Sequence, residues 1–454
     1  MKSATIPIPA ISRCVVVGLL LSLAAVPQYG ADVRKLDLKE AVELALSQNH
    51  SLRIARLKIV ENEQKKAGEH ASYFPAIKDA ANADDSTGID HIVIPAGTFG
   101  RVQGQLVPGN EVTIPQGLHH LLLNEASISQ PLTQLIRIHE ANRIAAADIA
   151  ISRADLKKDE NQVAVDVHRL YFGILIAGLQ KRAAEEQIAY AKQELKENTE
   201  GVRDGSLLRV SEIQGDTDVL QGQQTVLTAD LQVSDLNTEL DDLLGLPLDT
   251  KLDLQPVEAI GPDRLPLEEY VQTAWANNPE IASAEESIKQ ARAAVTSAKS
   301  EFIPDVTAYA SDTWQNGVPF IVPNFGTVGV RLNYDVFDFG KRRAAVRERE
   351  AQLAQAEENL KRLKDSISAQ VERSYNAIER TKDLMAVADQ VVALRRESER
   401  LSKNQVTQGV VTVVNTLEAT SATYKSQVDL LQATLNYMLG WAELKQTIGQ
   451  TPGL

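Results

Sequence analysis

The chain has 454 residues, of which 43% are hydrophobic but only 5% aromatic, so its apolar material is mostly small and aliphatic. This composition suits long helices packed along narrow seams better than thick cores built around aromatic rings. Acidic residues (61) outnumber basic ones (47), and the net charge of −14 gives no electrostatic reason to bind nucleic acid. The single cysteine, Cys14, excludes an intrachain disulfide and a thiolate metal cluster.

Residues 1–31 have the features of a secretory signal peptide. They contain Lys2 and Arg13 but no acidic residue, and an apolar run from Cys14 to Ala25 is followed by small residues. This run is shorter than the roughly 18 residues that a membrane-spanning helix needs, which favours cleavage over a retained anchor. No other part of the chain contains an apolar run of that length, so a bundle of membrane-spanning helices is excluded.

The rest of the chain consists of one unit used twice. A shift of 229 residues superposes Asn49 on Asn278, and a shift of 204 residues superposes Tyr171 on Tyr375, with many further matches at each offset. Matches at a constant offset over such a length indicate an internal duplication. The two offsets differ by 25 residues, which we place in the first copy between Pro75 and about Pro131.

The duplication sets the domain boundaries that we expect. They are a signal peptide over 1–31, a first repeat over 32–248, a linker over 249–264 and a second repeat over 265–454.

Each repeat is expected to contain a helix, a strand pair and then two further helices. The opening helices are predicted over about 36–72 and 265–301. Apolar and polar residues alternate over 328–336, which predicts a strand, with 306–314 as its partner and 126–132 as a weaker counterpart. The many glycines and prolines of 87–118 predict a loop or an irregular hairpin.

A very long helix is predicted after the second strand pair. Residues 341–408 contain neither Gly nor Pro, and apolar residues recur every seven positions, as in a coiled coil. Such a helix would be roughly 100 Å long at 1.5 Å per residue. Gly409 ends it, and a return helix is predicted over 410–448, while Gly205 marks the corresponding break in the first repeat.

The sequence offers no recognisable catalytic or metal-binding constellation. The adjacent pair His119 and His120 falls in a loop and lacks the spacing that places two ligands on one helix face. The nucleophile elbow, the phosphate-binding loop and the HExxH motif are all absent, and paired carboxylates fall on solvated helix faces. We therefore expect no enzyme activity and no cofactor.

This arrangement resembles the TolC-type outer-membrane efflux proteins, the outer membrane factor family. The resemblance is carried by Leu36–Asn49, by Asp335–Lys341 and by the turns at Gly205 and Gly409. It implies a mainly α fold with a small β part. Long coiled-coil helices would form a trimeric α-barrel, and each protomer would add four strands to a shared 12-stranded barrel in the outer membrane.

The resemblance also implies two functional sites at the periplasmic end. The helix turns that engage a periplasmic adaptor protein fall on Gly205, Ser206, Leu207, Leu208, Gly409, Val410, Val411 and Thr412. The alternative reading of these turns is that their exposed Leu and Val side chains only pack against neighbouring helices.

An acidic gate in the family falls on Asn415 and Glu418, so one acid of the pair is an amide here. The family's latch positions fall on Val406, Val411 and Ser211, which leaves Arg209 and Glu212 as candidate substitutes. In the alternative reading, Glu418 faces solvent between helices.

The resemblance implies a passive exit duct for efflux or type I secretion, located in the outer membrane and extending into the periplasm. Its partners would be two further copies of the chain, outer-membrane lipid, a periplasmic adaptor and an inner-membrane pump, with no nucleic acid. One alternative is a periplasmic coiled-coil scaffold or tether without a pore, and another is a cell-wall enzyme on a helical stalk. The strand pair around 304–336 argues against a scaffold, which has no use for it.

Overall fold

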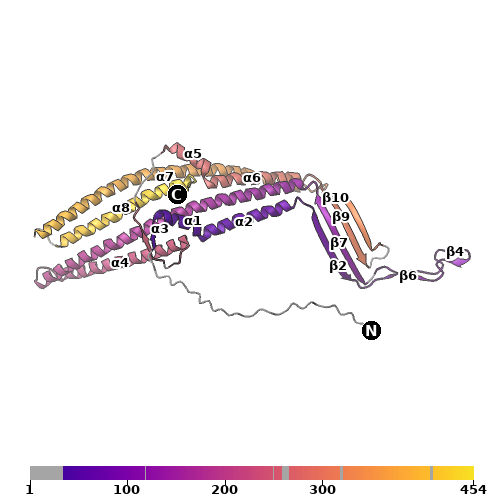
Figure 1. The fold of residues 1–454 in the computed structure, drawn as a ribbon, viewed down its shortest axis with the longest axis horizontal. Helices are drawn as coiled ribbons and strands as arrows, with labels where there is room; N and C mark the ends of the chain where they lie inside the picture. Colours follow the sequence, from indigo (N-terminus) through magenta and orange to yellow (C-terminus); the bar gives the residue numbers. More distant parts are fainter. Residues whose placement is uncertain are drawn as a thin grey trace, which may run out of the picture.

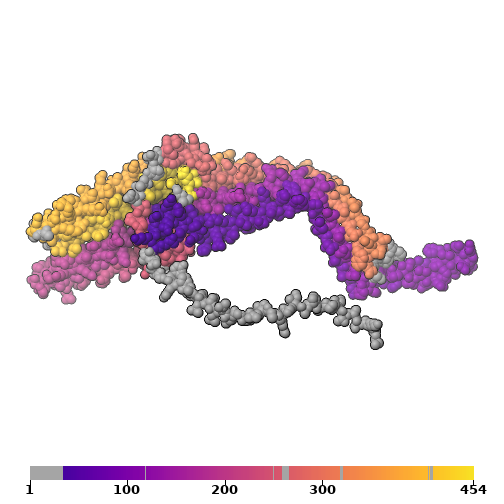
Figure 2. All heavy atoms as spheres, viewed as in Figure 1, coloured from indigo at the N-terminus to yellow at the C-terminus, as the bar shows by residue number. Residues whose placement is uncertain are grey.

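The computed structural model describes residues 34–117, 119–248, 250–257, 265–316, 321–408 and 413–453. It shows a long, bowed helical body from which a small sheet projects at one end (Figures 1 and 2). The predicted signal peptide and the predicted turn at 409–412 lie outside the described residues.

Each repeat opens with two consecutive helices, so the expectation of one continuous helix is wrong. The first repeat has α1 (Leu38–Gln48) and α2 (His50–Ala71). The second has α5 (Leu267–Asn277) and α6 (Pro279–Ser300), with the same lengths of 11 and 22 residues.

An asparagine causes the break in both repeats. Asn49 has an extended backbone (ψ 128°), and its Oδ1 accepts from the Leu52 amide at 3.1 Å, which caps α2. Its Nδ2 donates to the Leu243 carbonyl at 3.0 Å. Asn278 caps α6 in the same way and donates to the Thr447 carbonyl at 2.8 Å. Each break is thus held by the end of a distant helix.

Four long helices form the body. They are α3 (Leu135–Arg203), α4 (Arg209–Leu244), α7 (Lys341–Thr407) and α8 (Val413–Thr447), and the predicted 68-residue helix is confirmed as α7. Near the turns the helices lie side by side in the order α4, α3, α8, α7, and near the sheet in the order α2, α3, α6, α7 (Figure 1). The body is therefore a single layer of four helices.

The seam between α3 and α4 is packed closely through small residues. Gly215, Gly222 and Ala229 are buried on α4 at seven-residue spacing. A Cβ atom on Gly222 would lie 2.5 Å from Cγ1 of Ile188, so only glycine allows this approach. The seam has the heptad repeat of a coiled coil.

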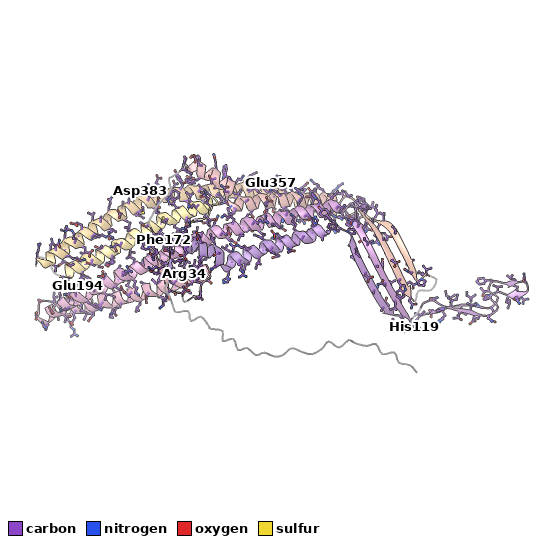
Figure 3. All side chains as sticks on the ribbon, in the orientation of Figure 1. Arg34, His119, Phe172, Glu194, Glu357 and Asp383 are labelled. Carbon is purple, nitrogen blue, oxygen red and sulfur yellow. The ribbon has the colours of Figure 1, made fainter. Side chains whose placement is uncertain are left out.

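Helix α3 contains a long apolar stretch. It contains an 18-residue window with the length and composition to cross a membrane, and half of that window is buried inside the protein. Because α3 packs against α4, α6 and α8, its apolar residues serve the helical layer. The core residues Tyr171 and Phe172 are fully buried there (Phe172 is labelled in Figure 3).

The projecting sheet has four antiparallel strands. They are β2 (Ala76–Asp85), β7 (His120–Pro131), β9 (Asp305–Asn316) and β10 (Asn324–Asn333), in the order β10-β9-β7-β2. The strand predicted over 328–336 therefore begins four residues earlier and ends at Asn333. Each repeat contributes two strands, and the outer strands β2 and β10 have no partner beyond them within the described residues.

The two faces of the sheet differ in polarity. One row across all four strands consists of Ile77, Ile128, Ala310 and Val328, and Val328 is 85% exposed. The adjacent row, on the opposite face, consists of Lys78, Ser127, Ser311 and Thr327. Since successive residues of a strand point to opposite faces, the face of Ile77 and Val328 is the more apolar one, although its next row carries Asp79 and Asp312.

An irregular hairpin extends from the far end of the sheet, as the sequence predicted for 87–118. It pairs β3 (His91–Ile94) with β6 (Val112–Pro115) and, at its tip, β4 (Arg101–Val102) with β5 (Gln105–Leu106). Figure 3 places His119 where this hairpin leaves the sheet.

A small two-stranded sheet, which was not predicted, packs on one face of the helical layer. β1 (Arg34–Leu36) runs parallel to β8 (Leu252–Leu254). The hydroxyl of Tyr171 on α3 lies 2.9 Å from the Leu36 carbonyl and 2.7 Å from the Gln255 carbonyl, which fixes this sheet to the helix.

Candidate docking turn and gate

The turn between α3 and α4 is closed by backbone hydrogen bonds. Gly205 has a φ of +77°, a conformation that favours glycine. The amides of Ser206 and Leu207 both donate to the Gly201 carbonyl, at 2.8 and 3.0 Å. These bonds satisfy the end of α3 and fix the direction in which the next side chains point.

The two leucines of the turn have different environments. Leu207 folds back over Gly201, where a Cβ atom would lie 2.8 Å from its Cδ1, and the residue is 41% exposed. Leu208 precedes α4 and is 76% exposed. Leu207 therefore packs on its own helix, as the alternative reading of the turn requires, whereas Leu208 presents its side chain to solvent. The equivalent turn, Gly409 to Thr412, lies outside the described residues.

Three acidic side chains from three helices gather around Tyr190 close to this turn. Burial is the main reason why the pKa of Tyr190 is raised to about 12. A hydrogen bond to Glu194 and the negative charges of Glu194, Glu418 and Asp218 raise it further. The predicted gate residue Glu418 on α8 thus lies within electrostatic range of Tyr190, as do Glu194 of α3 and Asp218 of α4, and Figure 3 shows Glu194 towards the turn end of the body.

The other predicted gate residues lie in the same region without joining this group. Arg209 is exposed at the start of α4, and Glu212 is half-buried in its first turn. Among the described residues, neither forms an ion pair with Glu418, and Asn415 is exposed on α8. Sequence reasoning missed Tyr190, Glu194 and Asp218. One feature of the sequence could have pointed to Glu194: it follows Gln187 by seven residues, which places both polar side chains on one face of α3.

No group of three or more metal-ligating residues with the geometry to hold a metal ion occurs in the described ranges. The acidic group around Tyr190 places the negative charges of Glu194, Glu418 and Asp218 near one phenol ring.

Comparison with known proteins agrees with this geometry. The sequence model described as "Outer membrane efflux protein" matches residues 270–450. The alkaline protease secretion protein AprF of Pseudomonas aeruginosa is 26% identical over 336 residues, which cover 70% of this chain and 68% of AprF.

Solved structures share the fold over nearly the whole chain. The outer membrane channel CmeC of Campylobacter jejuni superposes with a TM-score of 0.74 at 15% identity, over 91% of this chain and 85% of CmeC. The outer-membrane channel OprN superposes with a TM-score of 0.71 at 17% identity, over 92% and 91% of the two chains. The sequence match over 270–450, the relative and the fold agree with one another, and this chain is similar to the outer membrane efflux proteins.

Proposed function

We propose that this outer-membrane channel protein works as a homotrimer, in which three four-stranded sheets close into one 12-stranded barrel. The observation that carries this proposal is the pair of open sheet edges, β2 and β10. Open edges leave backbone groups without hydrogen bonds, which lipid does not tolerate, so each edge requires a strand from another copy. The apolar face would then meet lipid and the polar face would line a water-filled pore.

The helices support the same assembly. Helix α4 exposes Leu220 and Leu227, and helix α7 exposes Leu394 and Leu401, each pair at seven-residue spacing. These two helices form opposite edges of the layer. Packing α4 of one copy against α7 of the next would bury both stripes as a coiled-coil seam. A contact between two different surfaces closes into a ring when the rotation allows it, and three copies would form the α-barrel.

The repeat boundaries belong to the same proposal. We propose that 32–248 and 265–454 are two copies of one unit, joined by 249–264, after removal of 1–31. The support is that α1 and α5, and likewise α2 and α6, have equal lengths, while α3 and α7 differ by only two residues.

The turn end of the body is the proposed docking site for a periplasmic adaptor. Leu208 is the principal contact in the first turn, because its side chain is exposed while Leu207 packs on Gly201. The second turn, 409–412, would provide the equivalent contact from the other repeat.

The proposed gate is the acidic group near the same end. Three-fold symmetry would bring three copies of Glu418 around one axis, supported by Glu194 and Asp218. Such a ring attracts cations and disfavours anions at a constriction. The duct itself supplies a path and performs no catalysis, so an inner-membrane pump must provide the energy. The relative named for protease secretion favours polypeptide cargo.

Outer-membrane fractionation and semi-native electrophoresis test the assembly. The wild-type protein is expected in the outer membrane as a trimer. Replacing both Leu227 and Leu394 with Glu would place like charges in the seam and should yield mainly monomer, whereas Gln232→Glu, exposed about 140° around α4 from Leu227, should leave the trimer intact. A soluble periplasmic monomer of the wild-type protein would overturn the duct.

A further inference from the structure

A groove of about 890 Å³, lined by nine polar side chains among 14 residues, lies between α4, α3 and α8 next to the acidic gate. Its floor consists of small buried residues, namely Ala183, Ala184, Gly222 and Ala229. Its walls carry mainly amides and hydroxyls, from Gln180, Gln187, Gln221, Gln224, Thr225, Thr228, Gln232, Lys425, Val428 and Asp429.

The groove opens on the face of the layer that lies opposite the small sheet β1–β8. Tyr171 on α3 points to that sheet. Gln180 and Gln187 follow Tyr171 by 9 and 16 residues, which at 100° per residue corresponds to rotations of about 180° and 160°. Glu194 lies one heptad beyond Gln187 and therefore shares this face. The groove and the acidic gate are on the same side of the layer.

This side faces the interior of the ring in the proposed trimer. The opposite side carries α1 and the small sheet, which add a second layer there. That added layer would fill the duct if it faced inward, so it must lie outside. The placement of the groove in the lumen thus rests on the proposed function, and three copies would surround the path of the cargo.

The groove offers hydrogen-bonding groups of both kinds. The hydroxyls of Thr225 and Thr228 donate to the Gln221 and Gln224 carbonyls at 2.9 Å, which leaves their oxygen lone pairs available as acceptors. Oε1 of Gln187 accepts from the Ser421 hydroxyl at 2.6 Å and from Lys425 Nζ at 3.2 Å, so its amide NH₂ group remains a donor.

The lining fits a peptide backbone better than a drug-sized molecule. None of the 14 lining residues is aromatic, and only Lys425 and Asp429 are charged. Sites for drug-sized ligands are mostly apolar and aromatic. A side-chain amide, by contrast, has the same donor and acceptor as a peptide group, and the small floor residues let a backbone approach closely. From Gln221 to Gln232 the wall runs roughly 16 Å, the span of about five extended residues.

We propose that this groove is a cargo-binding site that holds an extended polypeptide by its backbone during passage. Amide contacts recognise the backbone whatever the side chains are, so the site would serve many sequences. Binding at such a site must be weak enough for release, as at other sites along a conduction path.

Blockade of single trimers in planar bilayers tests the site. The probe is an unfolded polypeptide of Gly, Ser and Thr with a short cationic end, added on the periplasmic side of the channel. Wild-type trimers should show transient blockades. The variant Gln221→Leu/Thr225→Val/Gln232→Leu should shorten their dwell time about ten-fold, because up to three hydrogen bonds to the peptide are lost. The single variant Gln221→Leu should show a smaller shortening.

The matched control is Gln223→Leu, an exposed residue of α4 outside the groove, which should leave the dwell time unchanged. Conductance without peptide should be equal in all variants, which shows that each trimer is intact. Equal dwell times in the triple variant and the wild type would overturn the proposal. Ethidium, a small cationic dye, is tested in parallel. If the triple variant changes blockade by ethidium but not by the peptide, the groove binds small molecules and the proposal is overturned. Absence of any conductance in the wild type would instead refute the duct.

Discussion

Alanine substitution at three glycines with positive φ tests how closely the two ends of each repeat pack. Gly449 (φ +80°) lies beyond the end of α8, and a Cβ atom there would overlap the backbone carbonyl oxygen of Asn277. At the corresponding Gly245 (φ +69°), a Cβ atom would lie 2.9 Å from the Gln48 carbonyl oxygen. Gly340 (φ +90°) has no atom within 4 Å of its Cβ position and serves as the matched control.

Substitution of each glycine by alanine should therefore destabilise the protein to different extents. Gly340→Ala adds only the strain of a left-handed residue, about 1–2 kcal/mol. Gly245→Ala adds a tight contact with Gln48. Gly449→Ala adds an overlap with the backbone of Asn277, which cannot relieve the overlap by changing a side-chain rotamer. Overpacking of this kind costs about 1–3 kcal/mol more. The total for Gly449→Ala is about 2–5 kcal/mol.

The assay is thermal denaturation of the detergent-solubilised protein, followed by circular dichroism at 222 nm. The expected order of melting temperatures is Gly340→Ala highest, Gly245→Ala intermediate and Gly449→Ala lowest. A Gly449→Ala protein that melts with Gly340→Ala would show that the contact with Asn277 does not hold the end of α8. The reasoning about repeat-end packing would then be refuted.

Two further predictions concern the turn end of the body. Glu418→Gln should lower the selectivity of the open channel for cations over anions and weaken its blockade by multivalent cations, measured as reversal potential and current in planar bilayers; unchanged values would remove Glu418 from the gate. Leu208→Asp should reduce transport in cells at least ten-fold while trimer yield stays normal, because an exposed apolar contact with the adaptor is lost; Leu208→Met is the conservative control, and transport by Leu208→Asp at the wild-type rate would place docking elsewhere.

The sequence predicted the long helices and the sheet because their signals are local. The absence of Gly and Pro over 341–408 and the alternation over 328–336 depend only on neighbouring residues. The break at Asn278 had a local signal that was overlooked, because Pro279 follows it as the first residue of α6, whereas no proline marks the break at Asn49. Each break is fixed by a hydrogen bond to a carbonyl 194 or 169 residues away, which no local pattern shows.

In the candidate site, too, only the features with local sequence signals could be predicted. The turn at Gly205 was predicted from the glycine alone, and its positive φ agrees with that reading. The neighbours of Glu418 were not predictable, because Tyr190 and Asp218 belong to other helices and approach it only through the packing of α3, α4 and α8. The different exposures of Leu207 and Leu208 also depend on a fold-back over Gly201 that spacing does not reveal.

The unbroken length of α3 sets the distance between the sheet and the proposed docking turn. Its 69 residues extend from the sheet to the docking turn, a distance of roughly 100 Å at 1.5 Å per residue. The seam with α4 repeats every seven residues, so only the insertion or deletion of whole heptads would keep Gly215 and Gly222 in register. The distance from the sheet to the turn can therefore change only in steps of about 10 Å, by equal changes in all four long helices. In the proposed assembly, an adaptor that docks at this turn would be matched to one setting of that length.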